Sequence, residues 1–121
     1  MELKRVVVTG LGALTPVGNN VAETWDNLVK GVSGAGPITH FDASKFKTHF
    51  ACEVKNFNGT DYIDRKELRK MDLYTQYAIA AAKEAVEDSG MDLEKEDLNR
   101  IGVIYGVGTV SYTHLTLPTI A

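Results

Sequence analysis

The sequence has little of the features that mark several special classes of protein. Cys52 is the single cysteine among 121 residues, so no disulfide can form within the chain and a reducing compartment is favoured. The 13 basic residues face 16 acidic ones, which excludes the strongly positive surface typical of nucleic-acid and anionic-membrane binding. No uncharged run is long enough to cross a bilayer, and glycines interrupt the apolar N-terminal run before the core of a signal peptide is complete. We therefore expect a cytoplasmic protein that binds neither nucleic acid nor membranes.

What is present has the composition of an ordinary folded domain. Hydrophobic residues make up 44% of the chain and charged residues 24%, which excludes a disordered polypeptide. A chain of this length can bury one modest core and cannot support two. We expect one domain, or a piece of one.

Periodicity and end signals predict alternating strands and helices. Three consecutive valines that run into glycines are typical of a strand covered on both faces, and Asn20 followed by Glu23 is typical of a helix start. In order, the sequence predicts a strand at residues 6–8, a helix at 20–30, a long loop at 32–60 with a short strand near 50–54, helices at 61–71 and 72–90, and a strand at 101–105. This order indicates the start of a parallel α/β sheet, which two strands cannot complete.

The predicted helix at residues 72–90 is rich in alanine. Small side chains permit close approach to another backbone, so we expect this helix to be buried. Seven acidic residues lie between residues 84 and 97, and we interpret them as a solvated helix end and loop. Because the helix needs cover, we expect the isolated chain to be only marginally soluble.

The glycines after the first predicted strand invite comparison with a dinucleotide site. Such a site needs a third glycine where Thr15 stands and a helix that begins at once, which Pro16 obstructs. We therefore interpret Gly10 and Gly12 as structural and expect no bound cofactor. A nucleotide-binding α/β domain remains a weaker alternative, which a titration with NAD or ATP would exclude.

Cys52 is a candidate nucleophile, with His40 and His49 as candidate bases. A reactive thiolate needs positive surroundings, and none is adjacent in the sequence, since Glu53 follows the cysteine directly. We predict instead a small apolar thiol packed beside Phe50. The two histidines lack a partner at metal-ligand spacing, so we interpret them as loop residues and expect neither a catalytic residue nor a metal site.

Four basic residues lie close together in the helix predicted at residues 61–71: Arg65, Lys66, Arg69 and Lys70. Acidic side chains between and beside them neutralise the segment, so composition favours a solvated helix face. The alternative is a small docking patch for an acidic partner, where exposed charges steer the encounter more than they add affinity.

Six strings along the chain together resemble one family. They are RVVVTGLGALTPVG at residues 5–18, the helix around Trp25, HFD at 40–42, DRKELRKMD at 64–72, QYAIAAAKEAVEDSG at 76–90 and RIGVIYG at 100–106. In this order they are similar to the N-terminus of a β-ketoacyl-acyl-carrier-protein synthase, above all the synthase II type of bacterial fatty-acid synthesis. We expect residues 1–108 to be the N-terminal part of that domain.

The resemblance implies a fold and a reaction. The fold is a thiolase-like αβαβα sandwich, of which this chain would hold an incomplete N-terminal portion, in a homodimeric parent. The reaction loads an acyl group onto a cysteine and joins it to decarboxylated malonyl-acyl carrier protein, in a fatty-acid or related polyketide pathway. The family's catalytic cysteine, histidines and lysine lie downstream of the matched region, so we expect this chain to be inactive. The resemblance also implies Lys66, Arg69 and Lys70 as contacts to acyl carrier protein.

The last residues depart from the family. VSYTHLTLPTIA at residues 110–121 has no family counterpart, and its first ten residues equal one reading frame of the transposase adapter used in sequencing libraries. We expect residues 109–121 to be an artefactual tail in which Tyr112 and His114 have no function. The alternative is a natural, noncatalytic module that binds carrier protein or modulates a dimer.

Overall fold

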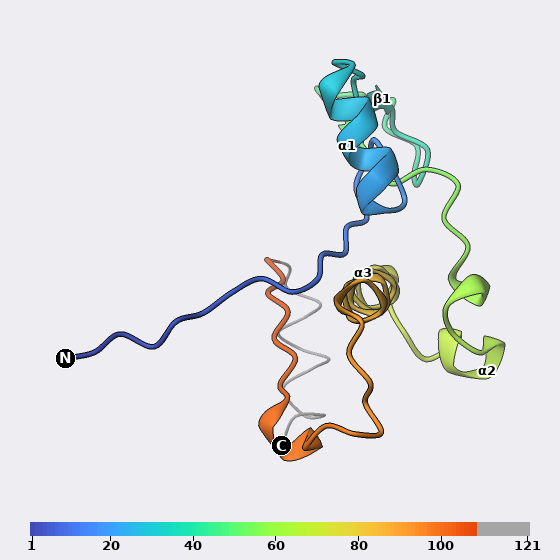
Figure 1. The fold of residues 1–121 in the computed structure, drawn as a ribbon. Helices are drawn as coiled ribbons and strands as arrows, with labels where there is room; N and C mark the ends of the chain where they lie inside the picture. The colour runs from blue at the N-terminus through green and yellow to red at the C-terminus, as the bar shows by residue number, and fades with distance from the viewer. Residues whose placement is uncertain (109–121) are drawn as a thin grey trace. The chain divides into compact units, whose positions relative to one another are not determined.

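A computed structural model describes residues 1–108 (Figure 1). The chain divides into two compact units, Met1–Met91 and a second that begins at Asp92, and each is described by itself. In chain order, the first unit holds α1 (Val21–Val29), β1 (Ala35–Pro37), β2 (Phe50–Cys52), a 3-10 turn at Gly59–Asp61, α2 (Arg65–Leu68) and α3 (Leu73–Ser89). The second unit contains a 3-10 turn at Leu98–Arg100. The tail expected at residues 109–121, with Tyr112 and His114, lies outside the described residues.

Local end signals determine the helix boundaries. At the start of α1, the Asn20 side chain accepts the N–H of Glu23 at 2.8 Å, and the Glu23 carboxylate accepts the N–H of Asn19 at 3.0 Å. α3 ends as predicted at Gly90, whose φ of 68° is the left-handed conformation that favours glycine. Asp72 precedes α3, but its side chain makes no capping hydrogen bond. The helix predicted at residues 61–71 is present as the 3-10 turn and the shorter α2.

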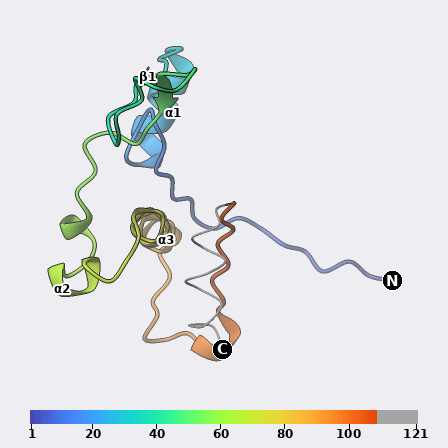
Figure 2. The same cartoon turned by 180° about the vertical axis from the view of Figure 1, so that it is seen from behind.

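The long loop folds back on itself as a two-stranded antiparallel hairpin. Ala35 pairs with Cys52, Gly36 with Ala51 and Pro37 with Phe50, so β2 confirms the short strand predicted near residues 50–54. Both views show this hairpin beside α1 (Figures 1 and 2).

The strands predicted at residues 6–8 and 101–105 are wrong for this structure. Neither segment forms a ladder in the described part of the chain, where the sheet is the antiparallel β1–β2 pair and not a parallel one. Val6 is 89% exposed and Ile104 is 98% exposed. A β-branched run favours an extended backbone, yet a strand forms only when a neighbour satisfies its N–H and C=O groups. The sequence indicated an extended backbone at residues 6–8 and 101–105. It did not show that the described residues provide no neighbouring strand for either segment.

The glycine-rich turn packs directly on α3. A Cβ atom built on Gly12 would lie 1.8 Å from the Ala81 carbonyl oxygen, and one on Gly10 would lie 2.2 Å from that of Ala85. Both separations are far shorter than any real contact, so the turn can approach α3 only because both residues are glycine. The alanines of α3 and the glycines of the turn are therefore complementary, which gives these glycines the structural role expected of them.

Few side chains are buried. Ala43 and Ala80 are the buried apolar residues of the described chain, and the predicted burial of α3 is reached only at Ala80. The apolar side of α1 faces solvent, with Trp25 68% exposed. Exposed apolar area of this kind is typical of a surface that binds other polypeptide. None of the described helices is both long enough and apolar enough to cross a bilayer.

Candidate functional site

The predicted docking residues lie together on α2 and the turn that follows it. α2 begins after Asp64, whose carboxylate accepts the N–H of Lys66 at 3.2 Å. The helical turn continues past the last residue of α2, because the N–H of Lys70 donates to the Glu67 carbonyl at 3.0 Å. Side chains three and four positions apart are neighbours on a helical turn. Lys66, Arg69 and Lys70, all exposed, therefore form one surface, the basic patch.

The basic patch is held against α3 by a tight turn. Gly59 is buried between α2 and α3, and a Cβ atom there would lie 2.7 Å from Leu68 Cδ2 and 2.5 Å from Gln76 Oε1. Gln76 also donates from its side chain to the carbonyl of Met71 at 3.3 Å. These contacts fix the backbone beneath the basic patch while its side chains stay in solvent.

An aromatic cluster packs α3 against the segment that leads to α2. Phe57 stacks on Tyr62 with ring centroids 5.8 Å apart, and it meets Tyr77 edge-to-face at 4.9 Å. Burial raises the pKa of Tyr77, and the negative charge of Glu53 adds to the rise. Tyr77 therefore stays neutral and acts as a packing residue.

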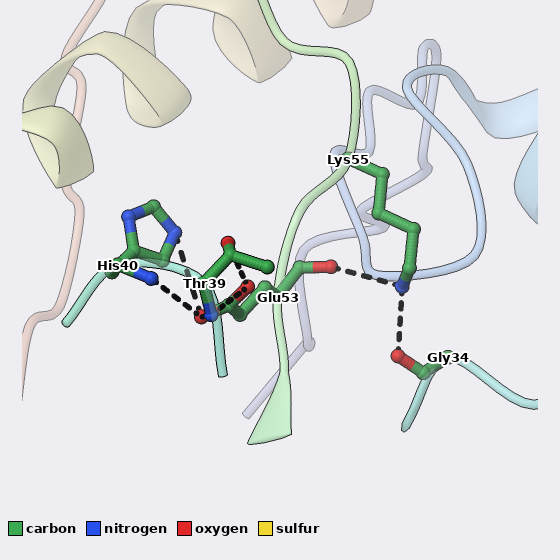
Figure 3. Close-up of polar contacts among 5 residues, drawn as sticks. All are labelled: Gly34, Thr39, His40, Glu53 and Lys55. Atoms are coloured by element: carbon green, nitrogen blue, oxygen red, sulfur yellow. Dashed lines mark hydrogen bonds and ion pairs between the residues drawn. The ribbon is translucent and has the colours of Figure 1, made fainter. Parts of the chain in front are cut away.

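Two charged residues near the hairpin, Glu53 and Lys55, form hydrogen bonds with backbone groups and, for Glu53, with a hydroxyl (Figure 3). The Glu53 carboxylate accepts the Thr39 hydroxyl at 2.7 Å and the Thr39 N–H at 3.1 Å, with the N–H of His40 at 3.4 Å. The hydrogen bonds from Thr39 lower the pKa of Glu53, and the bond from its hydroxyl makes the largest contribution. His40 Nε2 lies 3.9 Å from the same carboxylate. Glu53 thus remains ionised and closes the turn at the end of β1.

Lys55 joins three segments through its ammonium group. Its Nζ donates to the carbonyls of Pro16 at 3.0 Å, Gly34 at 2.8 Å and Glu53 at 3.2 Å. An ammonium has three N–H groups, so these bonds use all of them. Glu53 and Lys55 therefore have a structural role, in which they connect segments of the chain. A groove of about 380 Å³ lies beside them.

The structure corrects the prediction for Cys52. The thiol is exposed, where burial beside Phe50 was expected, because side chains alternate across a strand and Ala51 is the partly buried residue of β2. His40 and His49 lie in the loop between the strands as predicted, and His49 Nε2 contacts the Phe46 carbonyl at 2.7 Å. No hydrogen bond joins Cys52 to either histidine within residues 1–108. The part of the chain that the structure describes also lacks a group of three metal-ligating side chains.

Sequence reasoning missed the role of two acidic residues of α3. Asp88 accepts the N–H of Leu11 at 2.9 Å, and Glu84 accepts those of Ala13 at 2.9 Å and Val21 at 2.8 Å. These two carboxylates were interpreted as part of a solvated run. Their spacing of four residues places them on one face of α3, but the backbone groups they bind are more than 60 positions away in sequence.

A family model described as the N-terminal domain of β-ketoacyl synthase matches residues 3–119. The chain belongs to this family. The match confirms the resemblance carried by the six strings of the sequence.

Two curated relatives of this β-ketoacyl synthase chain show how much of such a protein it covers. The 3-oxoacyl-[acyl-carrier-protein] synthase 2 of Staphylococcus aureus (strain COL) is 53% identical over 105 residues, which is 87% of this chain and 25% of the relative. The synthase 2 of Vibrio harveyi is 50% identical over 108 residues, 89% of this chain and 26% of the relative. The chain thus spans about a quarter of the length of the curated relatives it matches.

Solved ketosynthases resemble the structure as well. The ishigamide ketosynthase/chain length factor aligns with a TM-score of 0.68 and 41% identity over 73% of this chain and 22% of that one. A type II polyketide ketosynthase bound to a hexaketide, in complex with its acyl-carrier protein, aligns with a TM-score of 0.63 and 31% identity over 81% of this chain and 24% of that one. The described residues therefore have a ketosynthase-like fold, and they do not contain the layers of a complete sandwich.

Proposed function

We propose that this chain supplies the N-terminal part of a condensing enzyme that elongates fatty acids. The observation that supports this proposal most strongly is the 53% identity, over 105 residues, to a 3-oxoacyl-[acyl-carrier-protein] synthase. In the complete enzyme, an acyl group would be held as a thioester on a cysteine. Decarboxylation of malonyl-acyl carrier protein would then give a carbanion that attacks this thioester and lengthens the chain. The complete enzyme would be a cytoplasmic homodimer with a thiolase-like αβαβα sandwich fold.

We assign this region a structural and docking role and not the chemical step. Its one thiol, Cys52, is exposed on a two-stranded hairpin and has no hydrogen bond to a histidine within the described residues. A thiol becomes a strong nucleophile when a neighbouring base or positive group stabilises its thiolate. No hydrogen bond or ion pair within residues 1–108 gives Cys52 such a partner, so the chain alone should not condense substrates.

The basic patch is the proposed docking site for acyl carrier protein. Lys66, Arg69 and Lys70 are exposed on one helical turn, where long cationic side chains can meet an acidic surface. A ketosynthase with 31% identity is known in complex with its acyl-carrier protein, which supports a partner of this class.

A direct assay tests this proposal. The purified chain and a complete synthase that contains it are each given acyl- and malonyl-acyl carrier protein, and the β-ketoacyl product is measured by mass spectrometry. We expect product from the complete enzyme alone. Product formed by the isolated chain would refute the proposal that this region takes no part in the chemical step. A complete enzyme with no condensing activity would refute the proposed reaction.

The second candidate function is a noncatalytic module that binds carrier protein or modulates a dimer. Two observations favour this candidate: the basic patch is exposed, and Cys52 has no hydrogen bond to a basic side chain among residues 1–108. The family match continues to residue 119, whereas the sequence analysis expected an artefactual tail from residue 109 onward. Genomic sequence past the codon for Gly108 separates the two candidates. An open frame that encodes a nucleophilic cysteine supports the enzyme, and a stop after Ala121 supports the module.

A further inference from the structure

The three cations of the basic patch are not equivalent. Lys70 Nζ lies 3.1 Å from Glu67 Oε1, three positions earlier on the same turn. Lys66 and Arg69 form no ion pair with any described residue. Two cations of the basic patch are therefore free, and the third is neutralised by its own chain.

The Glu67–Lys70 pair lies in solvent at the proposed docking surface. The Lys70 side chain is 70% exposed and that of Glu67 is 52% exposed, so an approaching protein can reach both. An acidic partner can pair with Lys70 only by displacing the Glu67 carboxylate from it. Exposed pairs of this kind change equilibria by about two- to five-fold. The pair is weak enough to exchange and strong enough to alter affinity.

We propose that Glu67 attenuates the docking of acyl carrier protein by holding Lys70, so that Lys66 and Arg69 carry the encounter. This inference rests on the proposed function, because it takes the basic patch as the carrier-protein site. Its consequence is an affinity set below the maximum that three cations could provide. Weaker docking favours rapid release, because affinity differences between related complexes lie mostly in the dissociation rate.

The test measures binding of fluorescently labelled acyl carrier protein to a complete synthase that contains this region, by fluorescence anisotropy. The variants are Glu67→Gln, Lys70→Gln and the two combined. The matched control is Asp26→Asn, which breaks the exposed Asp26–Lys30 pair of α1 and changes the net charge by the same amount. Titrations at about 10 mM and about 1 M salt change the Debye length from about 30 to about 3 Å.

We expect Glu67→Gln to bind carrier protein about two- to five-fold more tightly at low salt, with no difference at high salt and none for the control. Lys70→Gln alone should change the affinity for carrier protein little. Combined with Glu67→Gln, it should remove the gain in affinity that Glu67→Gln produces. An unchanged affinity in Glu67→Gln overturns the inference. So does a gain that survives in the double variant, because Glu67 would then act by repelling the partner and not by holding Lys70.

A failure of the proposed function gives a different result. If Lys66→Gln and Arg69→Gln leave carrier binding unchanged, the basic patch is not the docking site, and the inference falls with it. If both variants weaken binding while Glu67→Gln does nothing, docking stands and only the role of Glu67 is lost.

Discussion

The carboxylate of Glu84 accepts the backbone N–H of Val21 at 2.8 Å, so α3 holds the first residue of α1. The N–H groups in the first turn of a helix have no partner within the helix. Glu84 satisfies one of them and places a negative charge at the positive end of the α1 dipole. The same carboxylate accepts the N–H of Ala13, and in this way one side chain joins the glycine-rich turn, α1 and α3.

Glu84→Ala should loosen this junction. Hydrogen bonds to a charged group contribute about 1.5 kcal/mol each, which corresponds to about ten-fold in amide exchange. We expect hydrogen exchange at Val21 and Ala13 to become about ten-fold faster in the variant. Glu87→Ala is the control, because Glu87 is an exposed residue of α3 with no side-chain hydrogen bond to described residues. Equal exchange in the two variants would show that the junction does not depend on Glu84.

Gly12→Ala should disrupt the contact between the glycine-rich turn and α3. The new methyl carbon would lie 1.8 Å from the Ala81 carbonyl oxygen and 2.8 Å from the Ala85 nitrogen, and these backbone atoms cannot move aside as a flexible side chain could. Forced overpacking of this kind costs about 1 to 3 kcal/mol. We expect faster cleavage of residues 1–20 in limited proteolysis. Gly36→Ala is the control, since a Cβ atom there meets nothing within 4 Å, and it should be cleaved like the wild type.

Features set by a few neighbouring residues could be predicted from the sequence. Asn20 with Glu23 marked the start of α1, and Gly90 marked the end of α3, because capping depends on residues within one turn. The spacing of Lys66, Arg69 and Lys70 likewise predicted neighbouring faces of a short helix, and all three residues are exposed on α2 and the turn after it.

Features set by distant parts of the chain could not be predicted. The run at residues 6–8 reads as a strand, but pairing needs a neighbour that the described residues lack. The exposure of Cys52 depends on which face of β2 turns inward, and a shift of one residue reverses it. Glu84 looked solvated because the N–H of Val21, which it binds, lies 63 positions away.

The ionisation of Glu53 should control the turn at the end of β1. Its pKa is lowered from the ordinary value near 4.5, so the folded state favours the charged form. The resulting stability is present above pH 4.5 and is lost as the pH falls through the lowered pKa. An NMR titration of the Thr39 amide should therefore have its midpoint below 4.5.

Thr39→Val tests the cause of that lowered pKa. The Thr39 hydroxyl makes the largest contribution, so its removal should move the Glu53 midpoint upward toward 4.5, and Thr39→Ser should restore the wild-type value. Ser44→Ala serves as the control, because Ser44 lowers the pKa of Asp42 and makes no bond to Glu53. A midpoint that stays unchanged in Thr39→Val would assign the shift to the backbone N–H groups instead.

Cys52 should be chemically accessible and dispensable. Because its side chain is exposed, we expect the thiol of the folded chain to react with a maleimide about as fast as that of the urea-unfolded chain. Because no described histidine or cationic side chain is hydrogen-bonded to it, Cys52→Ala in a complete synthase should keep the rate of condensation within about two-fold of the wild type. A large loss of kcat with unchanged carrier-protein affinity would instead place this thiol in the chemical step. Protection from the maleimide would show that β2 presents its other face to solvent, with Ala51 outward and Cys52 inward.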